Sequence, residues 1–200
     1  MGAAGYATTG SAAEPGTSLV TLIGDVARPG VVEVPNGTPL EVLVPGRADA
    51  PVLVGGYHGT WVRNAHELVL NRGTLREAGS PLGAGVIARP HAGTCSLQEV
   101  AAVSRWLANE SLGQCGPCFF GLPALADDMQ AFADGTGSER QASRRAQQVR
   151  GRGACAHPDG AVQFMSTAIV ALADDIRVHR EHGSCGRPPS NILPLPRSSR

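Results

Sequence analysis

The sequence predicts an α+β protein in which a small β-rich module is followed by a bundle of four helices. The first third contains short aliphatic and β-branched runs, separated by turn dipeptides such as Pro29-Gly30 and Asn36-Gly37. After residue 89 the apolar residues change from a spacing of about two to the helical period of about 3.6. With 200 residues, the chain is long enough for one ordinary domain or two small ones.

The composition argues against several classes of function. The 17 basic and 17 acidic residues balance, so no general attraction to nucleic acid or anionic lipid is expected. The N-terminus does not have the pattern of a signal peptide, and no apolar stretch is long enough for a membrane span. We therefore expect a cytoplasmic protein without direct membrane insertion. In that compartment its five cysteines favour metal or redox chemistry over a disulfide framework.

The predicted β-rich module covers residues 18–90, after a small and polar segment at 1–17 that is typical of a linker or a truncated end. We expect a small mixed sheet. Its strands are predicted within SLVTLIGDV at 18–26, VVEV at 31–34, LEVLV at 40–44, PVLVGG at 51–56 and LGAGVIAR at 82–89. The Gly-rich stretch at 54–59 does not open a helix, so it does not predict a dinucleotide-binding loop.

The predicted helical domain covers residues 91–184. Ser96 followed by Glu99 is typical of a capping box at the start of the first helix. A polar third helix is expected at 139–150, and Gly183 is expected to end the fourth. The residues expected to face the core are Leu97, Val100, Val103, Leu107, Leu122, Leu125, Met129, Phe132, Val162, Met165, Ile169, Leu172 and Ile176. The Pro- and Ser-rich residues 185–200 predict a disordered tail.

Three cysteines lie in the two loops that join the first two and the last two helices. Cys115 and Cys118 form a C-x-x-C motif in ESLGQCGPCFFG at 110–121, and Cys155 lies in GRGACAHPDG at 151–160. In an up-down bundle these loops lie at the same end, so we expect the three thiols to be close together. Thiolates suit zinc and iron–sulfur clusters, and His157 would complete a tetrahedral Cys₃His zinc site.

Two other interpretations of the C-x-x-C motif remain open at this point. A thioredoxin-like dithiol is disfavoured because the motif follows a helix, whereas in that fold it follows a strand and opens a helix. The other interpretation is that the cysteines are buried side chains that act only as small hydrophobic groups.

The order of several segments resembles the NADH-binding flavoprotein subunit of respiratory complex I, the F-type subunit of NADH-quinone oxidoreductases. GDVARPGVVEVPNGTPLEVLV, PVLVGG, LGAGVIA, ANESLGQCGPCFFGL and CAHPDGA occur in the family's order over residues 17–183. The resemblance implies a ubiquitin-like β-grasp of the SLBB type at 18–90 and an iron–sulfur binding bundle at 91–184. It also implies that Cys115, Cys118 and Cys155 bind an iron–sulfur cluster, [4Fe–4S] or [3Fe–4S], with His157 as a further candidate ligand.

The chain departs from this family in two ways. Leu112 occupies the position of the first cluster cysteine, and the large domain that binds FMN and NADH does not precede the β-grasp. The resemblance therefore implies an electron-transfer module of an NADH dehydrogenase (quinone) type of oxidoreductase. We assign no catalytic residue and do not expect the chain to oxidise NADH alone, because FMN and NADH would act through a missing domain or partner.

The implied partners are a flavin- and NADH-binding domain or subunit and a ferredoxin-like iron–sulfur protein, in a complex at the inner face of the membrane. The alternative is a non-catalytic interaction module with a structural Cys₃His zinc site or a degenerate, metal-free site. Cys95 and Cys185 lie at the other end of the predicted bundle. We expect them to be incidental thiols.

Overall fold

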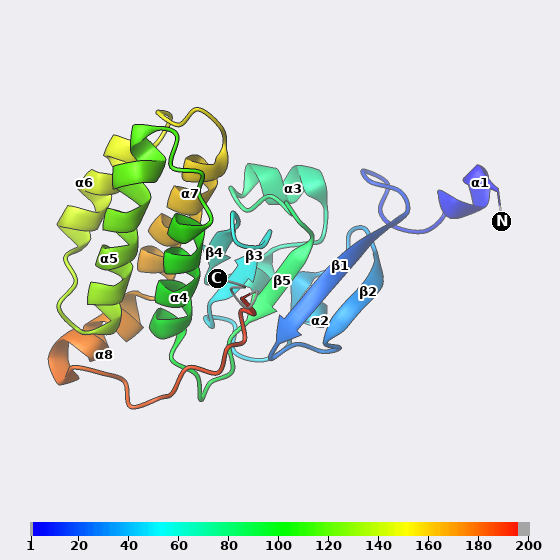
Figure 1. Cartoon of the computed structure of the whole chain (residues 1–200). Helices are drawn as coiled ribbons and strands as arrows, with labels where there is room; N and C mark the ends of the chain where they lie inside the picture. Colours follow the sequence, from blue (N-terminus) through cyan, green and yellow to red (C-terminus); the bar gives the residue numbers. More distant parts are fainter. Residues whose placement is uncertain (1, 196–200) are drawn as a thin grey trace. The chain divides into compact units, whose positions relative to one another are not determined.

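A computed structural model describes residues 2–195 and divides the chain into two compact units, residues 1–91 and 92–200. The first unit contains a sheet and short helices, and the described part of the second is helical (Figure 1). The predicted α+β class is therefore confirmed. Within residues 2–195, every helix falls short of the length and apolar character needed to cross a bilayer.

The first unit is built on a mixed five-stranded sheet with the order β2-β1-β5-β3-β4 (Figure 1). β1 (Thr17–Gly24) pairs with β2 (Gly30–Pro35) as a hairpin and runs parallel to β5 (Val86–Arg89). β3 (Val52–Val54) is antiparallel both to β5 and to β4 (Thr60–Val62). The last strand, β5, thus lies at the centre of the sheet and runs parallel to β1, the first strand of the hairpin. This arrangement is expected of a β-grasp.

Short helices connect these strands, and one of them corrects the sequence prediction. The predicted strand at 40–44 is instead α2 (Leu40–Leu43), one helical turn that follows Pro39. Pro39 is fixed at φ −58°, and Leu40 and Leu43, three positions apart, are both buried on one helical face. β4 was not predicted either. The remaining short helices are α1 (Ala3–Tyr6), η1 (Ala65–Glu67) and α3 (Arg72–Glu77).

The core of the first unit is formed by the sheet together with α2, η1 and α3. It is aliphatic, in keeping with the low aromatic content. Its members are Val20, Leu22, Val34, Leu40, Leu43, Val44, Val52, Val54, Ala65, Leu70, Leu75, Leu82 and Ile87.

The second unit contains five α-helices in its described residues. They are α4 (Ser96–Asn109), α5 (Leu122–Ala133), α6 (Glu139–Val149), α7 (His157–Ala171) and α8 (Ala173–His182). α5 contacts each of the other four and is the centre of the bundle. The predicted four-helix count is therefore corrected: the last predicted helix starts earlier, at His157, and is divided at Leu172, where ψ is 22°. Gly183 ends α8 with φ 79°, as predicted.

The start of α4 differs from the predicted capping box. Cys95 is the N-cap residue, and its side chain makes no capping hydrogen bond. The Glu99 carboxylate instead accepts hydrogen bonds from the backbone N–H groups of Ser190 and Asn191, at 2.7 Å each, and of Leu193, at 3.2 Å. Glu99 therefore binds a segment that is distant in sequence.

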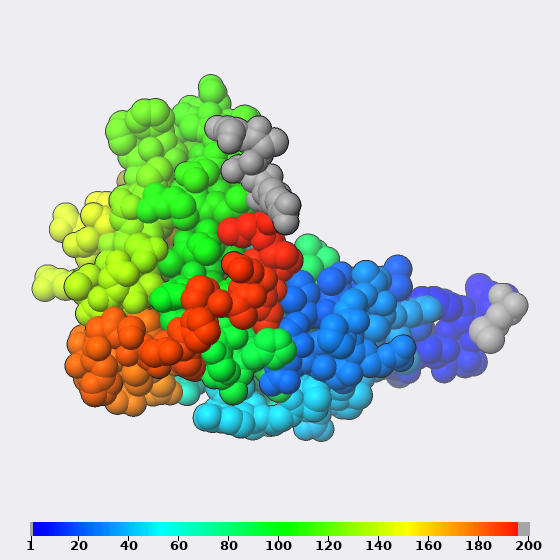
Figure 2. All heavy atoms as spheres, turned by 60° about the horizontal axis from the view of Figure 1, so that its bottom comes forward, coloured from blue at the N-terminus to red at the C-terminus, as the bar shows by residue number. Residues whose placement is uncertain are grey.

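These contacts order part of the chain that was predicted as a disordered tail. The Cys95 N–H also donates to the Pro188 carbonyl oxygen at 3.0 Å, and the side chains of Ile192 and Leu193 are buried. Figure 2 shows the end of the described chain, in red, lying on the surface of the helices. Within the predicted tail, residues 188–193 are thus held against α4, whereas residues 196–200 lie outside the described part.

Candidate functional site

The loop between α4 and α5 places Cys115 and Cys118. Gly113 adopts a left-handed φ of 62°, which turns the chain after α4. Cys118 lies in η2 (Pro117–Gly121), a π-helical turn that continues into α5. Such turns are rare in helices and occur frequently at functional sites. A side chain at Gly121 would lie 2.4 Å from Val149 Cγ2, so only glycine lets η2 approach the end of α6 this closely.

The structure brings the thiols of the two loops together at this end of the bundle. Cys118 is buried, Cys115 is half-buried and Cys155 is exposed. The side chains of Cys115 and Cys118 hydrogen-bond each other, and the backbone of Ala154 hydrogen-bonds the Cys115 sulfur. Cys155 is near enough to Cys118 for its charge to act on that thiol. Their role as ligands stays a prediction.

The surroundings give neighbouring thiols opposite tendencies to ionise. Backbone hydrogen bonds from Ala154 and Cys118 lower the pKa of Cys115 below its usual value. Burial raises the pKa of Cys118, and negative charge on Cys115 and Cys155 raises it further. A cationic metal centre would relieve this repulsion between thiolates, so the donor set fits a thiolate-bound cluster.

The fourth ligand position lacks a thiol. Leu112 is 88% exposed and has no donor atom, and the hydroxyl of the preceding residue, Ser111, hydrogen-bonds Cys118. His157 Nε2 donates to the Leu107 carbonyl oxygen at 3.0 Å, so it joins the start of α7 to α4. A metal bond from His157 would have to use its other ring nitrogen or break this hydrogen bond. The two loops thus supply three thiols, with the Ser111 hydroxyl beside Cys118.

Glycine positions around the loops support a specific prediction. A side chain at Gly153 would lie 2.7 Å from Pro158 Cγ and 2.8 Å from the Cys155 carbonyl oxygen. Gly116 has helical φ and ψ of −52° and −47°, with nothing within 4 Å of a side chain there, so glycine is not required at 116. Gly153→Ala should cost about 1–3 kcal/mol of stability by overpacking and reduce the iron bound per chain.

Gly116→Ala is the matched control for this prediction, since it adds the same methyl group to the other loop. It should leave stability within about 1 kcal/mol of the parent and leave iron content unchanged. Urea unfolding and iron analysis measure both effects. Equal behaviour of the two variants would show that the close packing at Gly153 does not position Cys155.

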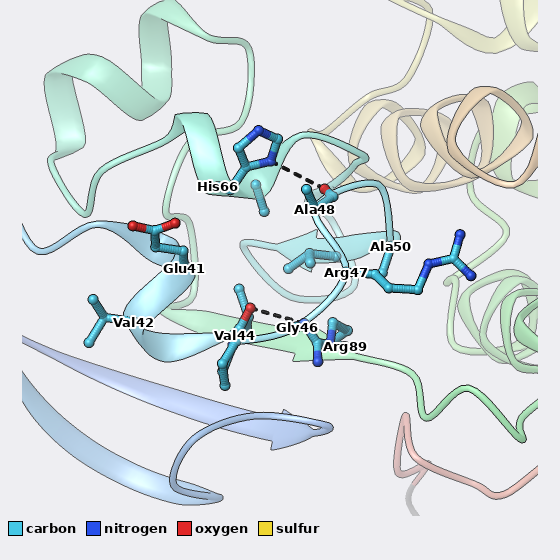
Figure 3. A pocket seen from close by; sticks show the side chains of 12 residues that line it. Glu41, Val42, Val44, Gly46, Arg47, Ala48, Ala50, His66 and Arg89 are labelled. Atoms are coloured by element: carbon cyan, nitrogen blue, oxygen red, sulfur yellow. Dashed lines mark hydrogen bonds between the residues drawn. The ribbon is translucent and has the colours of Figure 1, made fainter.

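A separate cavity of about 340 Å³ lies in the first unit (Figure 3). It is lined by α2, the loop that follows it, η1 and Arg89. The buried Arg89 guanidinium already donates to the Val44 carbonyl oxygen at 2.9 Å and to Asp25 at 2.8 Å. His66 Nδ1 lies 3.3 Å from the Ala48 carbonyl oxygen. Because these polar groups serve the fold, we assign no ligand to this cavity.

A second group of metal-binding side chains lies at the other end of α4. The ligand atoms of Cys95, His179 and Cys185 all lie within 4.8 Å of one another. From the sequence, both cysteines were expected to be incidental thiols. No local pattern could have joined them, because Cys95 and His179 are 84 positions apart.

Comparison with protein families identifies the region that carries the three loop cysteines. Residues 98–179 match the sequence model of the family described as "NADH-ubiquinone oxidoreductase-F iron-sulfur binding region". This match includes Cys115, Cys118 and Cys155 and ends at His179.

Curated relatives and solved structures extend the similarity over most of the chain. The F-type subunit 2 of the NADH-quinone oxidoreductase of Rhizobium meliloti (strain 1021) is 28% identical over 92% of this chain and 47% of its own length. The F-type subunit of the NADH-quinone oxidoreductase of Salmonella typhimurium is 31% identical over 85% of this chain and 41% of its own. This chain thus spans less than half the length of these relatives.

Among solved structures, a chain of an NAD⁺-reducing [NiFe]-hydrogenase in the H₂-reduced state has a TM-score of 0.72 at 22% identity. The match covers 88% of this chain and 31% of that one. The air-oxidised state of such a hydrogenase gives the same TM-score at 21% identity. At this level of identity the likeness establishes the fold.

Proposed function

We propose that the chain is an iron–sulfur electron-transfer module, on the premise that residues 98–179 match the sequence model of the NADH-ubiquinone oxidoreductase-F iron–sulfur binding region. The observation that carries the proposal is that Cys115, Cys118 and Cys155 lie near one another at one end of the bundle, within the matched residues. Three soft thiolates near one another are typical of iron–sulfur ligation.

The three cysteines would hold the cluster through their sulfur atoms, and the cluster would accept and release single electrons. Backbone N–H groups of Ala154 and Cys118 already bond the Cys115 sulfur. Hydrogen bonds of this kind to the sulfur atoms help to set the reduction potential of a cluster. With three thiolates available, we propose a [3Fe–4S] cluster or a [4Fe–4S] cluster with a non-cysteine ligand on one iron.

The partners we propose are a flavin- and NADH-binding domain or subunit as electron donor and a ferredoxin-like iron–sulfur protein as acceptor. Three large apolar side chains beside the cysteines support a contact surface there: Leu112, Phe119 and Phe120 are 88%, 63% and 72% exposed. Exposed apolar groups that cluster in this way typically mark interaction sites. Such a complex would hold the chain peripherally at the inner face of a membrane, on the cytoplasmic side.

The proposal is tested by anaerobic purification, iron and sulfide analysis, and EPR before and after reduction with dithionite. We expect about three to four iron and about four sulfide per chain. The signal should be that of an oxidised three-iron or a reduced four-iron cluster. A variant with Ser at positions 115, 118 and 155 should bind neither iron nor sulfide. Iron-free protein from anaerobic cells, or equal iron in parent and variant, would contradict the proposal.

A non-redox interaction module is the second candidate, and the exposed Leu112 at a ligand position favours it. In that case the loop cysteines would bind one structural zinc together with His157, or no metal. Chelation would then lower the melting temperature without affecting electron transfer. The same metal analysis separates the two candidates, because this one predicts zinc or no metal where the first predicts iron and sulfide.

A further inference from the structure

The group formed by Cys95, His179 and Cys185 lies at the end of α4 that is remote from the loop cysteines. Cys95 Sγ lies 3.4 Å from His179 Nε2, and all three ligand atoms are within 4.8 Å of one another. We propose that these three side chains form a zinc site, with two thiolates and one imidazole as protein ligands and a water molecule in the fourth position. This site is separate from the proposed cluster ligands.

The hydrogen bonding of His179 fixes the ring in the form that a metal requires. His179 is fully buried, and its Nδ1 lies 2.7 Å from the Ala133 carbonyl oxygen. Because a carbonyl can only accept, Nδ1 carries the hydrogen in this bond. In the neutral ring Nε2 therefore presents its lone pair, and this is the nitrogen that faces Cys95 Sγ. Metal-binding histidines typically donate their other N–H to a carboxylate or a backbone carbonyl in this way.

Close packing holds the backbone of His179 in place. Gly135, just after α5, has a φ of 75°, and a side chain there would lie 2.3 Å from the His179 carbonyl oxygen. The end of α8 thus packs closely against the residues that follow α5, near Ala133, whose carbonyl oxygen orients the imidazole.

The surroundings of the two cysteines differ. Burial raises the pKa of the Cys95 thiol to about 11, so a bound metal ion would have to hold this side chain as a thiolate. Arg187 hydrogen-bonds Cys185 and is paired with Asp175 at 2.5 Å. The Arg187 guanidinium stabilises negative charge on the Cys185 sulfur. Two thiolates would in turn balance the charge of Zn²⁺.

Zinc fits these donors better than the other common cations. Calcium and magnesium require oxygen ligands, whereas Cys₂His with one open position is a known zinc ligand set. A disulfide between Cys95 and Cys185 would use the two sulfurs but not the oriented imidazole nitrogen. The ion would join the start of α4, the end of α8 and the segment that follows it.

The test measures zinc and cobalt binding by two anaerobically purified proteins. One is the parent chain of 200 residues, and the other is the variant with Ser at 115, 118 and 155. That variant removes the loop thiols, so metal that it retains must bind elsewhere. We expect about one zinc per chain after desalting in both proteins. Cobalt(II) should give the visible absorption of a tetrahedral ion and a thiolate charge-transfer band.

Cys185→Ser, at a half-buried position, should abolish zinc retention and the cobalt charge-transfer band without unfolding the chain. His179→Gln should do the same, with circular dichroism as the check that the bundle still folds. His182→Ala is the matched control: His182 is on the same helix but exposed, and zinc binding should not change. Zinc content that is equal in the parent and in Cys185→Ser would overturn the proposal. The proposal would also be overturned if the reduced, folded parent retains no zinc. Formation of a Cys95–Cys185 disulfide in air would not change that conclusion.

Discussion

Leu112→Cys should convert the cluster of this chain to a four-thiolate [4Fe–4S] form. The substitution supplies the missing thiol in a loop where Ser111, the preceding residue, already hydrogen-bonds Cys118. Because Leu112 is 88% exposed, its replacement removes few packing contacts and should leave stability within about 0.5 kcal/mol of the parent. We expect iron per chain to reach about four and the oxidised three-iron EPR signal to disappear.

Leu112→Ala is the control for this result. It removes the same exposed side chain without adding a sulfur, so its iron content and EPR spectrum should match those of the parent. If Leu112→Cys also matches the parent, the thiol at 112 does not reach the cluster. In that case either a non-cysteine group holds the fourth iron or the cluster has no fourth iron. If neither protein binds iron, the electron-transfer proposal itself is wrong.

Features of the fold that depend on local spacing could be predicted from the sequence. Leu122, Leu125 and Met129 recur every three or four positions, and all three are buried in α5. The same periodicity located α4 and most of α7 and α8. It succeeded because each helix buries one apolar face, so the pattern in the sequence and the packing in the bundle have the same cause.

Short elements were harder to predict because a few residues fit more than one period. The segment LEVLV at 40–44 has the aliphatic composition of a strand, yet Leu40 and Leu43 also share one face of a helical turn. The preceding Pro39 and the burial of both leucines favour the turn. β4 has three residues, too few to establish any period.

Side chains that act through distant partners could not be predicted at all. Glu99 had the spacing of a capping box, but its partners lie more than 90 positions away. The local sequence does not indicate that His179 is fully buried against Cys95 and the Ala133 carbonyl oxygen. The loop cysteines were easier to place because an up-down topology alone brings their two loops to one end.

Glu99→Ala should release residues 188–193 from α4 and destabilise the chain by about 2–3 kcal/mol. The buried carboxylate accepts three backbone N–H bonds, and hydrogen bonds to charged groups contribute about 1.5–3 kcal/mol each. The released N–H groups regain water, so the net loss is smaller than their sum. The loss of stability also includes the exposure of Ile192 and Leu193, which are buried in the parent. Urea unfolding and hydrogen exchange of the Leu193 amide measure the two effects.

Glu110→Ala removes an exposed glutamate just after the same helix and should change stability by less than about 0.5 kcal/mol. Glu99→Gln should be intermediate, because its carboxamide keeps one acceptor oxygen but directs an N–H₂ group at the remaining backbone donor. Since Cys185 precedes the segment that Glu99 binds, Glu99→Ala should also weaken zinc retention while leaving iron unchanged. Loss of iron together with zinc would mean that the whole bundle depends on this contact, and an unchanged Leu193 exchange rate would mean that Glu99 does not hold the segment.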